Sequence, residues 1–215
     1  MDKWELIDHT FKFRVGDSEE KGGCTLIGGT WKDVTTSDLF KDKKVVLFSL
    51  PGAFTPTCSG QELPSYDDMY QQFKDKGIDA VYCISVNDAF VMNAWARDLQ
   101  IKNVVMIPDG CGTFTRSMGM LVNKPKQGFG NRSWRYMAVV NDGVVEKWWQ
   151  EPGINNEGLD DDPYVETTPE NMIDYLQGKH WQKNYIVLNY IIKGVKIYYE
   201  SIKWYGCCTK KLLWH

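Results

Sequence analysis

Short apolar runs alternate with longer stretches in which apolar residues recur every three or four positions. The apolar runs cover residues 44–50 (KVVLFSL), 78–86 (IDAVYCISV) and 103–110 (NVVMIPDG), and each is bounded by charged or turn-forming residues. Continuous rather than alternating apolar character is typical of strands that are buried on both faces of a sheet. The pattern therefore predicts three central β-strands.

Helical spacing appears in four segments, at residues 59–77, 88–101, 112–120 and 168–178. Asp88 is placed to act as the N-cap of the second helix. The last helix begins with Thr168 as its cap and Pro169 in its first turn, and it closes at Gly178. By the same reasoning we expect Asn87 and Asp109 to be turn or cap residues.

The remaining strong pattern is residues 132–151, which predict a hairpin of two β-rich runs joined by Asn-Asp-Gly. Strands and helices that alternate, followed by a hairpin and a helix, indicate an α/β fold around a mixed central sheet flanked by helices. A thioredoxin-like fold fits this order. We predict one domain over residues 1–178.

Composition adds limits on location and partners. The chain has 215 residues, 43% of them hydrophobic, and no run of 18 apolar residues or N-terminal apolar segment, so we expect a cytoplasmic protein without membrane contact. The net charge of −3 combines a tail, residues 179–215, at +6 with a body at −9. An acidic body argues against a nucleic-acid substrate.

The tail over residues 179–215 differs in amino-acid composition from the body. It is rich in Lys, Ile, Tyr and Trp, contains no Pro or Ala, and shows no clean helical or strand period. Two interpretations stay open. The tail is either a remnant or reading-frame artefact that is mostly disordered, which we favour, or a contact segment for RNA or another acidic surface.

The chain has six cysteines, at positions 24, 58, 83, 111, 207 and 208. They form no CxxC pair and no Cys/His cluster, so we expect neither a metal site nor a thioredoxin-type dithiol. Cys207 and Cys208 are adjacent, and a disulfide between them would be strained. We interpret Cys24 and Cys111 as incidental.

Cys58 differs because it follows a buried strand and precedes a predicted helix. Unpaired backbone N–H groups and the helix dipole at that position favour the reactive thiolate. Thr55 offers a hydroxyl to the sulfur or to an oxygen held against it, and Pro51 and Pro56 stiffen the loop. The alternative is that Cys58 is a small buried apolar residue.

The segment PGAFTPTCS resembles the active-site loop of the peroxiredoxins, specifically the peroxiredoxin-5 (type II, atypical) subfamily. Pro51, Thr55 and Cys58 occupy its Pro-x-x-x-Thr-x-x-Cys signature, and Arg135 matches the strand-borne catalytic arginine. The resemblance extends over about residues 8–178, through the segments 84–96, 107–120, 128–153 and 169–178. This part of the chain is similar to the peroxiredoxin part of bacterial peroxiredoxin–glutaredoxin hybrids.

The resemblance implies a thiol-dependent peroxidase that reduces hydrogen peroxide and small alkyl hydroperoxides without a metal, haem or flavin cofactor. Cys58 would be the peroxidatic nucleophile, assisted by Thr55 and Arg135, with Pro51 and Gly52 in the substrate loop. Arg132 lies nearby in the sequence, and the motif position favours Arg135 over it. Two rival interpretations are a peroxide sensor whose oxidised cysteine is read by a partner protein, and a non-catalytic interaction protein.

Regeneration of Cys58 needs a second thiol. Some relatives carry a resolving cysteine in the region of residues 154–171, where this chain has none. We therefore expect a one-cysteine cycle in which glutathione, glutaredoxin or thioredoxin supplies the second sulfur. Cys83 is a possible second thiol, although it falls inside a predicted core strand. Phe54 and Trp95 belong either to a homodimer surface or to the core.

Overall fold

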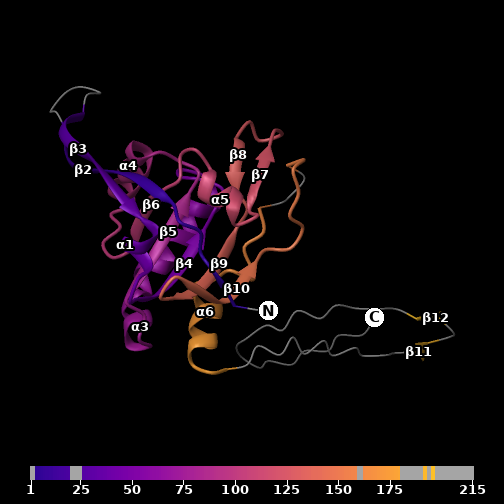
Figure 1. Ribbon diagram of the computed structural model, residues 1–215. Coiled ribbons are helices and arrows are strands. Elements are labelled where there is room, and N and C mark those ends of the chain that lie inside the picture. The colour runs from indigo at the N-terminus through magenta and orange to yellow at the C-terminus, as the bar shows by residue number, and fades with distance from the viewer. Residues whose placement is uncertain (1–2, 20–25, 159–161, 180–190, 193–194, 197–215) are drawn as a thin grey trace. The chain divides into compact units, whose positions relative to one another are not determined.

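The computed structural model describes residues 3–19, 26–158, 162–179, 191–192 and 195–196 (Figure 1). The chain divides into two compact units, residues 1–179 and 180–215. In the second unit the described residues form two short antiparallel strands, β11 (Ile191–Ile192) and β12 (Val195–Lys196). Cys24, Cys207 and Cys208 lie outside the described residues, and the tail's disorder and role stay predictions.

The centre of the first unit is a six-stranded mixed sheet. Its order is β1 (Trp4–Glu5), β10 (Val144–Gln150), β9 (Tyr136–Asn141), β4 (Lys44–Ser49), β5 (Ala80–Ser85) and β6 (Val105–Pro108). The strands β4, β5 and β6 are parallel, whereas the other neighbouring pairs are antiparallel. The predicted α/β class, the mixed sheet and its three central strands are confirmed.

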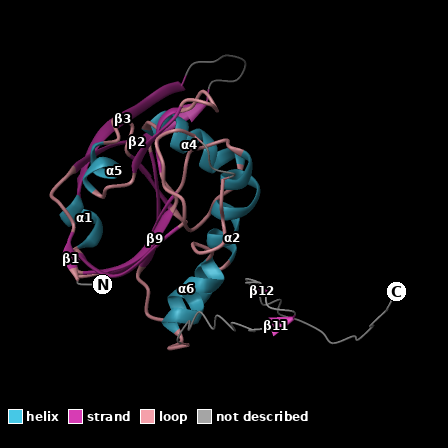
Figure 2. Ribbon diagram, turned by 90° about the vertical axis from the view of Figure 1, so that its right-hand side faces the viewer, coloured by secondary structure: helices cyan, strands magenta, loops and turns pink. Residues whose placement is uncertain are grey.

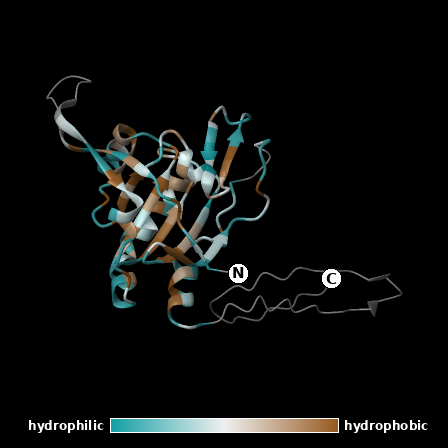
Figure 3. Cartoon of the chain, viewed as in Figure 1, coloured by the Kyte–Doolittle hydropathy of each residue, from teal (hydrophilic) through white to brown (hydrophobic). Residues whose placement is uncertain are grey.

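Helices cover both faces of this sheet (Figure 2). On one face lie α1 (Thr36–Phe40) and α5 (Thr113–Ser117), and on the other lie α2 (Leu63–Asp68), α3 (Tyr70–Asp75), α4 (Ala89–Asp98) and α6 (Pro169–Leu176). Successive side chains of a strand point to opposite faces, so β4 contributes Val45 and Leu47 to one core and Val46 and Phe48 to the other. Hydrophobic residues are concentrated on these central strands (Figure 3).

Two hairpins lie outside the central sheet. The first pairs β2 (Thr10–Glu19) with β3 (Leu26–Thr35), and the second pairs β7 (Leu121–Lys124) with β8 (Gly130–Ser133). The pattern of the sequence did not predict the first of these hairpins. Its strands are largely polar, and they are held in place because Phe11 and Val34 are buried in the core that also contains α1 and α5.

The predicted helix over residues 59–77 is interrupted. It opens with the π-helical turn η1 (Cys58–Glu62), continues as α2, and restarts as α3 after Met69, whose ψ of 4° leaves the helical region. Capping side chains behave as expected, since Asp88 accepts from the N–H of Phe90 and Val91 and Thr168 accepts from that of Asn171.

The hairpin predicted over residues 132–151 is wrong in its first part. Ser133 ends β8, which pairs with β7, and the hairpin consists of β9 and β10 only. The turn between them places Asp142 and Gly143 at φ 48° and 76°, the left-handed conformations that a tight two-residue turn requires. Arg135, expected on a strand, therefore lies just ahead of β9.

None of the helices in the described part of the chain is both long enough and apolar enough to cross a bilayer. The cytoplasmic location stays a prediction.

Candidate active site

Strand β4 delivers the chain to a loop, residues 51–57, that is closed by its own hydrogen bonds. The Thr55 hydroxyl donates to the Gly52 carbonyl at 2.8 Å, and the Ser59 N–H donates to the Thr55 carbonyl at 2.9 Å. Asn87 holds the loop from outside, because its Oδ1 accepts from the Ala53 N–H at 3.0 Å. Thr55 is thus fixed within the loop that contains Gly52.

Cys58 begins the π-helical turn that follows this loop. The turn is defined by a hydrogen bond from the Leu63 N–H to the Cys58 carbonyl, and the Cys58 side chain is 0% exposed. Trp95 Nε1 donates to Ser59 Oγ at 3.0 Å and ties the turn to α4. Trp95 is buried and belongs to the core, whereas Phe54 in the loop is 54% exposed.

The π turn brings Glu62 to the same side of the helix as Cys58. A π turn contains more residues than an α turn, so the side chain four positions later returns nearly above the first. Both side chains contact one guanidinium nitrogen: Arg135 Nη1 lies 3.6 Å from Cys58 Sγ and forms an ion pair with Glu62. Glu62 is fully buried.

Arg135 is itself surrounded on several sides. Its Nε donates to the Pro163 carbonyl at 3.0 Å, and its Nη2 pairs with Asp162. Only 2% of the Arg135 side chain is exposed. The guanidinium therefore places a fixed positive charge and an N–H donor against the sulfur of Cys58.

The segment of residues 162–167 closes the site on the outer side of Arg135. Glu151, just after β10, holds this segment, because its Oε1 accepts from the N–H groups of Val165, Glu166 and Thr167 at 2.8 to 2.9 Å. The Tyr164 ring lies 5.4 Å from the Arg135 guanidinium carbon, and burial raises the pKa of Tyr164.

The sequence of this chain is similar to proteins of a known family. Residues 16–166 match the model of the redoxin family. A peroxiredoxin of Sinorhizobium fredii is 57% identical over 171 residues, which cover 78% of this chain and 87% of that protein. The chain belongs to the peroxiredoxin family.

Other peroxiredoxins extend the match. The hybrid peroxiredoxin hyPrx5 of Haemophilus influenzae is 52% identical over 156 residues, which cover 73% of this chain but 63% of that protein. The crystal structure of the Plasmodium falciparum antioxidant protein, a 1-Cys peroxiredoxin, has a TM-score of 0.73 and 34% identity over 81% of this chain and 98% of that one. The thioredoxin-like fold and the resemblance to peroxiredoxin-5 relatives are confirmed, and the chain is accordingly a thiol-dependent peroxidase.

In this peroxiredoxin the two candidate arginines have different surroundings. Arg132, on β8, donates from Nη1 to the Val86 carbonyl at 3.1 Å, and its guanidinium lies 5.7 Å from the Phe129 ring centre. Burial lowers the pKa of Arg132. Arg135 is therefore the arginine at the cysteine.

Cys83 lies on β5, where it pairs in register with Phe48. It is 0% exposed, and its pKa is raised well above the ordinary value, chiefly by burial and further by the neighbouring Cys58. Its predicted place inside a core strand is confirmed. Cys111, in a turn, is exposed. Asp109 is a cap as expected, since it accepts from the backbone N–H and hydroxyl of Thr115 at 2.7 Å.

Sequence reasoning missed three carboxylates of the site, namely Glu62, Glu151 and Asp162. The four-residue spacing between Cys58 and Glu62 on a helix was a usable signal. Asp162 and Glu151 had no comparable signal, because each acts across a contact that only the folded chain creates. Within the described ranges of the chain no cluster of metal-ligating side chains occurs.

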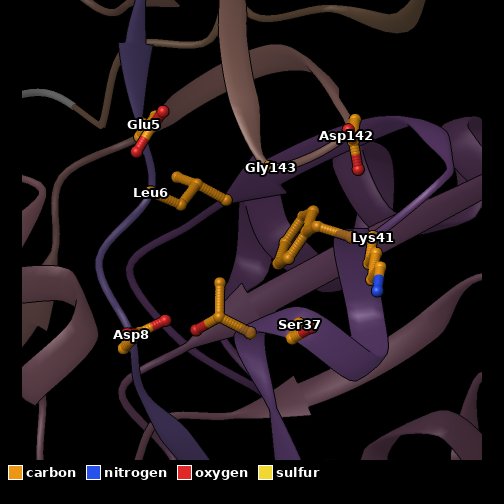
Figure 4. Close-up of a pocket in the computed structure, with 9 residues that line it drawn as sticks. Glu5, Leu6, Asp8, Ser37, Lys41, Asp142 and Gly143 are labelled. Carbon is orange, nitrogen blue, oxygen red and sulfur yellow. The ribbon is translucent and has the colours of Figure 1, made fainter.

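A separate pocket lies between the N-terminal segment, α1 and the turn from β9 to β10 (Figure 4). It is lined by Glu5, Leu6, Asp8, Thr36, Ser37, Phe40, Lys41, Asp142 and Gly143. None of the predicted site residues is among them, so the pocket is distinct from the Cys58 site.

Proposed function

We propose that this peroxiredoxin reduces hydrogen peroxide and small alkyl hydroperoxides with Cys58 as the peroxidatic nucleophile. The observation that carries the proposal is the 3.6 Å approach of Arg135 Nη1 to Cys58 Sγ inside a site where both side chains are almost completely buried. A cysteine that served only as packing would not need a buried guanidinium beside it, because an arginine is costly to bury without purpose.

In the proposed step, the Cys58 thiolate attacks one oxygen of the peroxide. A sulfur–oxygen bond forms, the oxygen–oxygen bond breaks, and the leaving oxygen takes up a proton from solvent and departs as water or an alcohol. Cys58 is oxidised to a sulfenic acid while the peroxide is reduced. Negative charge grows on the leaving oxygen, so donors fixed around both oxygens lower the barrier.

Arg135 is the first of these donors, because its Nη1 already lies at the sulfur. Thr55 has a complementary role. Its hydroxyl donates to the Gly52 carbonyl at 2.8 Å, so its oxygen is held by the substrate loop as an acceptor for the O–H of the bound peroxide. Pro51 and Gly52 shape that loop, and backbone N–H groups of the first helical turn add further donors. These roles follow the motif positions and are proposed on that basis.

For regeneration we propose a one-cysteine cycle. A thiol of glutathione or glutaredoxin attacks the sulfenic acid, a mixed disulfide forms, water leaves, and a second thiol then releases reduced Cys58. Support comes from the absence of cysteine in residues 154–171, from the resemblance to peroxiredoxin–glutaredoxin hybrids, and from the similarity to a 1-Cys peroxiredoxin. Cys83 is too enclosed to supply the second sulfur without local opening.

The test measures peroxide consumption with three reductants in turn: glutathione alone, glutathione with glutaredoxin, and the thioredoxin system. The variants are wild type, Cys58→Ser and Arg135→Ala, with Cys111→Ser as the matched control at an exposed cysteine. We expect sustained turnover with glutaredoxin, loss of turnover in Cys58→Ser, and wild-type rates in Cys111→Ser.

Three results would count against the proposal. Wild-type rates in Cys58→Ser would show that Cys58 is not the nucleophile. Turnover with thioredoxin alone would leave Cys58 in place but overturn the reductant. A single stoichiometric oxidation with no turnover under any reductant would favour the peroxide sensor instead.

A further inference from the structure

The guanidinium of Arg135 has an inner and an outer side, and a carboxylate lies on each. Glu62 pairs with Nη1 on the inner side, beside the sulfur, and is fully buried. Asp162 pairs with Nη2 on the outer side, and its side chain is 36% exposed. The Pro163 carbonyl accepts from Nε at 3.0 Å, so one short segment holds two of the three guanidinium nitrogens.

This contact is built into the fold rather than left to a loose surface chain. Glu151 accepts three backbone hydrogen bonds from residues 165–167, and the Thr167 hydroxyl donates to the same oxygen at 2.9 Å. The Tyr66 hydroxyl adds a bond of 2.8 Å to the Thr167 carbonyl. The segment that carries Asp162 is therefore anchored to the end of β10 and to α2.

The two carboxylates also determine the charge felt by Cys58. Charged and titratable groups from several elements surround its sulfur. They are Arg135 ahead of β9, Glu62 on η1, Cys83 on β5, and Asp162 and Tyr164 on the segment after β10. One cation is thus shared between two carboxylates and the sulfur. Each carboxylate opposes the thiolate by its charge while it holds the arginine in place.

We propose that Asp162 is a positioning residue for the peroxidase reaction, fixing the outer side of the Arg135 guanidinium so that Nη1 stays directed at Cys58. The proposal rests on the proposed function of Cys58. Asp162 acts through Arg135, because it contacts Nη2, whereas Nη1 is the guanidinium nitrogen that contacts the sulfur.

Two substitutions test this role. Asp162→Asn keeps an oxygen that can accept from Nη2 but removes the charge, whereas Asp162→Ala removes both. The matched control is Asp174→Asn, because Asp174 is 35% exposed and pairs with Lys179 at 2.9 Å rather than with Arg135. Each variant is assayed for its rate constant with hydrogen peroxide and for its stability in urea. The reaction of Cys58 is isolated by subtracting the rate of the same variant carrying Cys58→Ser.

In Asp162→Ala we expect the rate constant with peroxide to fall about 10-fold, because Arg135 loses its partner at Nη2 and Nη1 is held less firmly in the required geometry. In Asp162→Asn we expect the rate constant to stay near the wild-type value, because the amide oxygen still accepts from Nη2. Asp174→Asn should leave the rate constant unchanged.

The proposal is overturned if Asp162→Ala retains the wild-type rate constant, or if Asp162→Asn loses as much of the rate as Asp162→Ala. A change in urea stability alone would also overturn it, because that result assigns Asp162 a purely structural role. Failure of the proposed function is distinguishable, since it appears as peroxide consumption that survives Cys58→Ser.

Discussion

The two described buried cysteines of this peroxiredoxin occupy neighbouring parts of one core and have opposite surroundings. Cys58 and Cys83 are both 0% exposed, and both belong to the cluster of buried residues beneath α2, α4 and α6. Cys58 stands at a helical turn with a guanidinium nitrogen 3.6 Å from its sulfur. Cys83 stands in the middle of β5, where burial raises its pKa.

The difference shows that burial by itself does not decide what a thiol does. A buried thiol without a cation keeps its proton, because a thiolate is poorly solvated in the core. In the proposed function the position of Arg135 is what distinguishes Cys58, the proposed nucleophile, from Cys83 in the same core.

The strongest test of this contrast removes the nucleophile. Cys58→Ser should reduce peroxide turnover by at least about a thousandfold, since a serine hydroxyl is not ionised at neutral pH and cannot replace a thiolate. The measurement is the second-order rate constant with hydrogen peroxide under the glutaredoxin system. If Cys83→Ser has the larger effect, the contrast between the two cysteines is reversed.

The next test removes the cation. Arg135→Ala should lower the rate constant with peroxide by about a hundredfold, because the positive charge and the N–H donor beside the sulfur are lost. Arg132→Ala is the comparison, and we expect a much smaller effect because Arg132 bonds to the Val86 carbonyl instead. Equal losses in both variants would contradict the assignment of Arg135.

A third test loosens the segment that encloses Arg135. Glu151→Gln weakens the charge-assisted bonds to residues 165–167 and should cost about 2 kcal/mol of unfolding free energy, with a several-fold loss of rate. The control is Glu146→Gln on β10, where the partially exposed carboxylate pairs with Lys3 and Lys44. A surface pair contributes less than about 1 kcal/mol, so the urea midpoint should barely move.

The smallest effect belongs to Cys83. Its pKa is raised above the ordinary value of 9.0 in the folded state, so the native chain keeps the proton that the unfolded chain releases in alkali. The contribution of the protonated Cys83 thiol to the free energy of unfolding is complete below pH 9.0. It is lost as the pH rises from that value towards the higher pKa of the folded state. Between about pH 8 and pH 10, the stability of wild type should fall by about 1.4 kcal/mol more than that of Cys83→Ala.

Urea unfolding of both proteins at the two pH values measures this difference, with Cys111→Ala as a control at an exposed thiol. If the two stabilities change in parallel, Cys83 is not the buried neutral thiol that the fold indicates. Peroxide turnover should remain at the wild-type level in Cys83→Ala at neutral pH.

Much of the fold could be predicted because its causes are local. The apolar run of β4 and the caps Asp88 and Thr168 depend on residues within a few positions of one another, and all of them are confirmed. The β2–β3 hairpin could not be predicted in this way. Its polar strands are stabilised by the burial of Phe11 and Val34 in a core that includes distant segments.

The sequence by itself determined the central strands, the capped helices and the placement of Cys58 in a Pro/Thr loop at the start of a helix, because neighbouring residues encode each of these. Only the tertiary structure decided which groups surround the sulfur. Arg135 is 77 residues from Cys58 and 73 from Glu62, and Asp162 is 27 residues from Arg135. Contacts over such separations depend on how β9, η1 and the segment after β10 pack together, which no local pattern specifies.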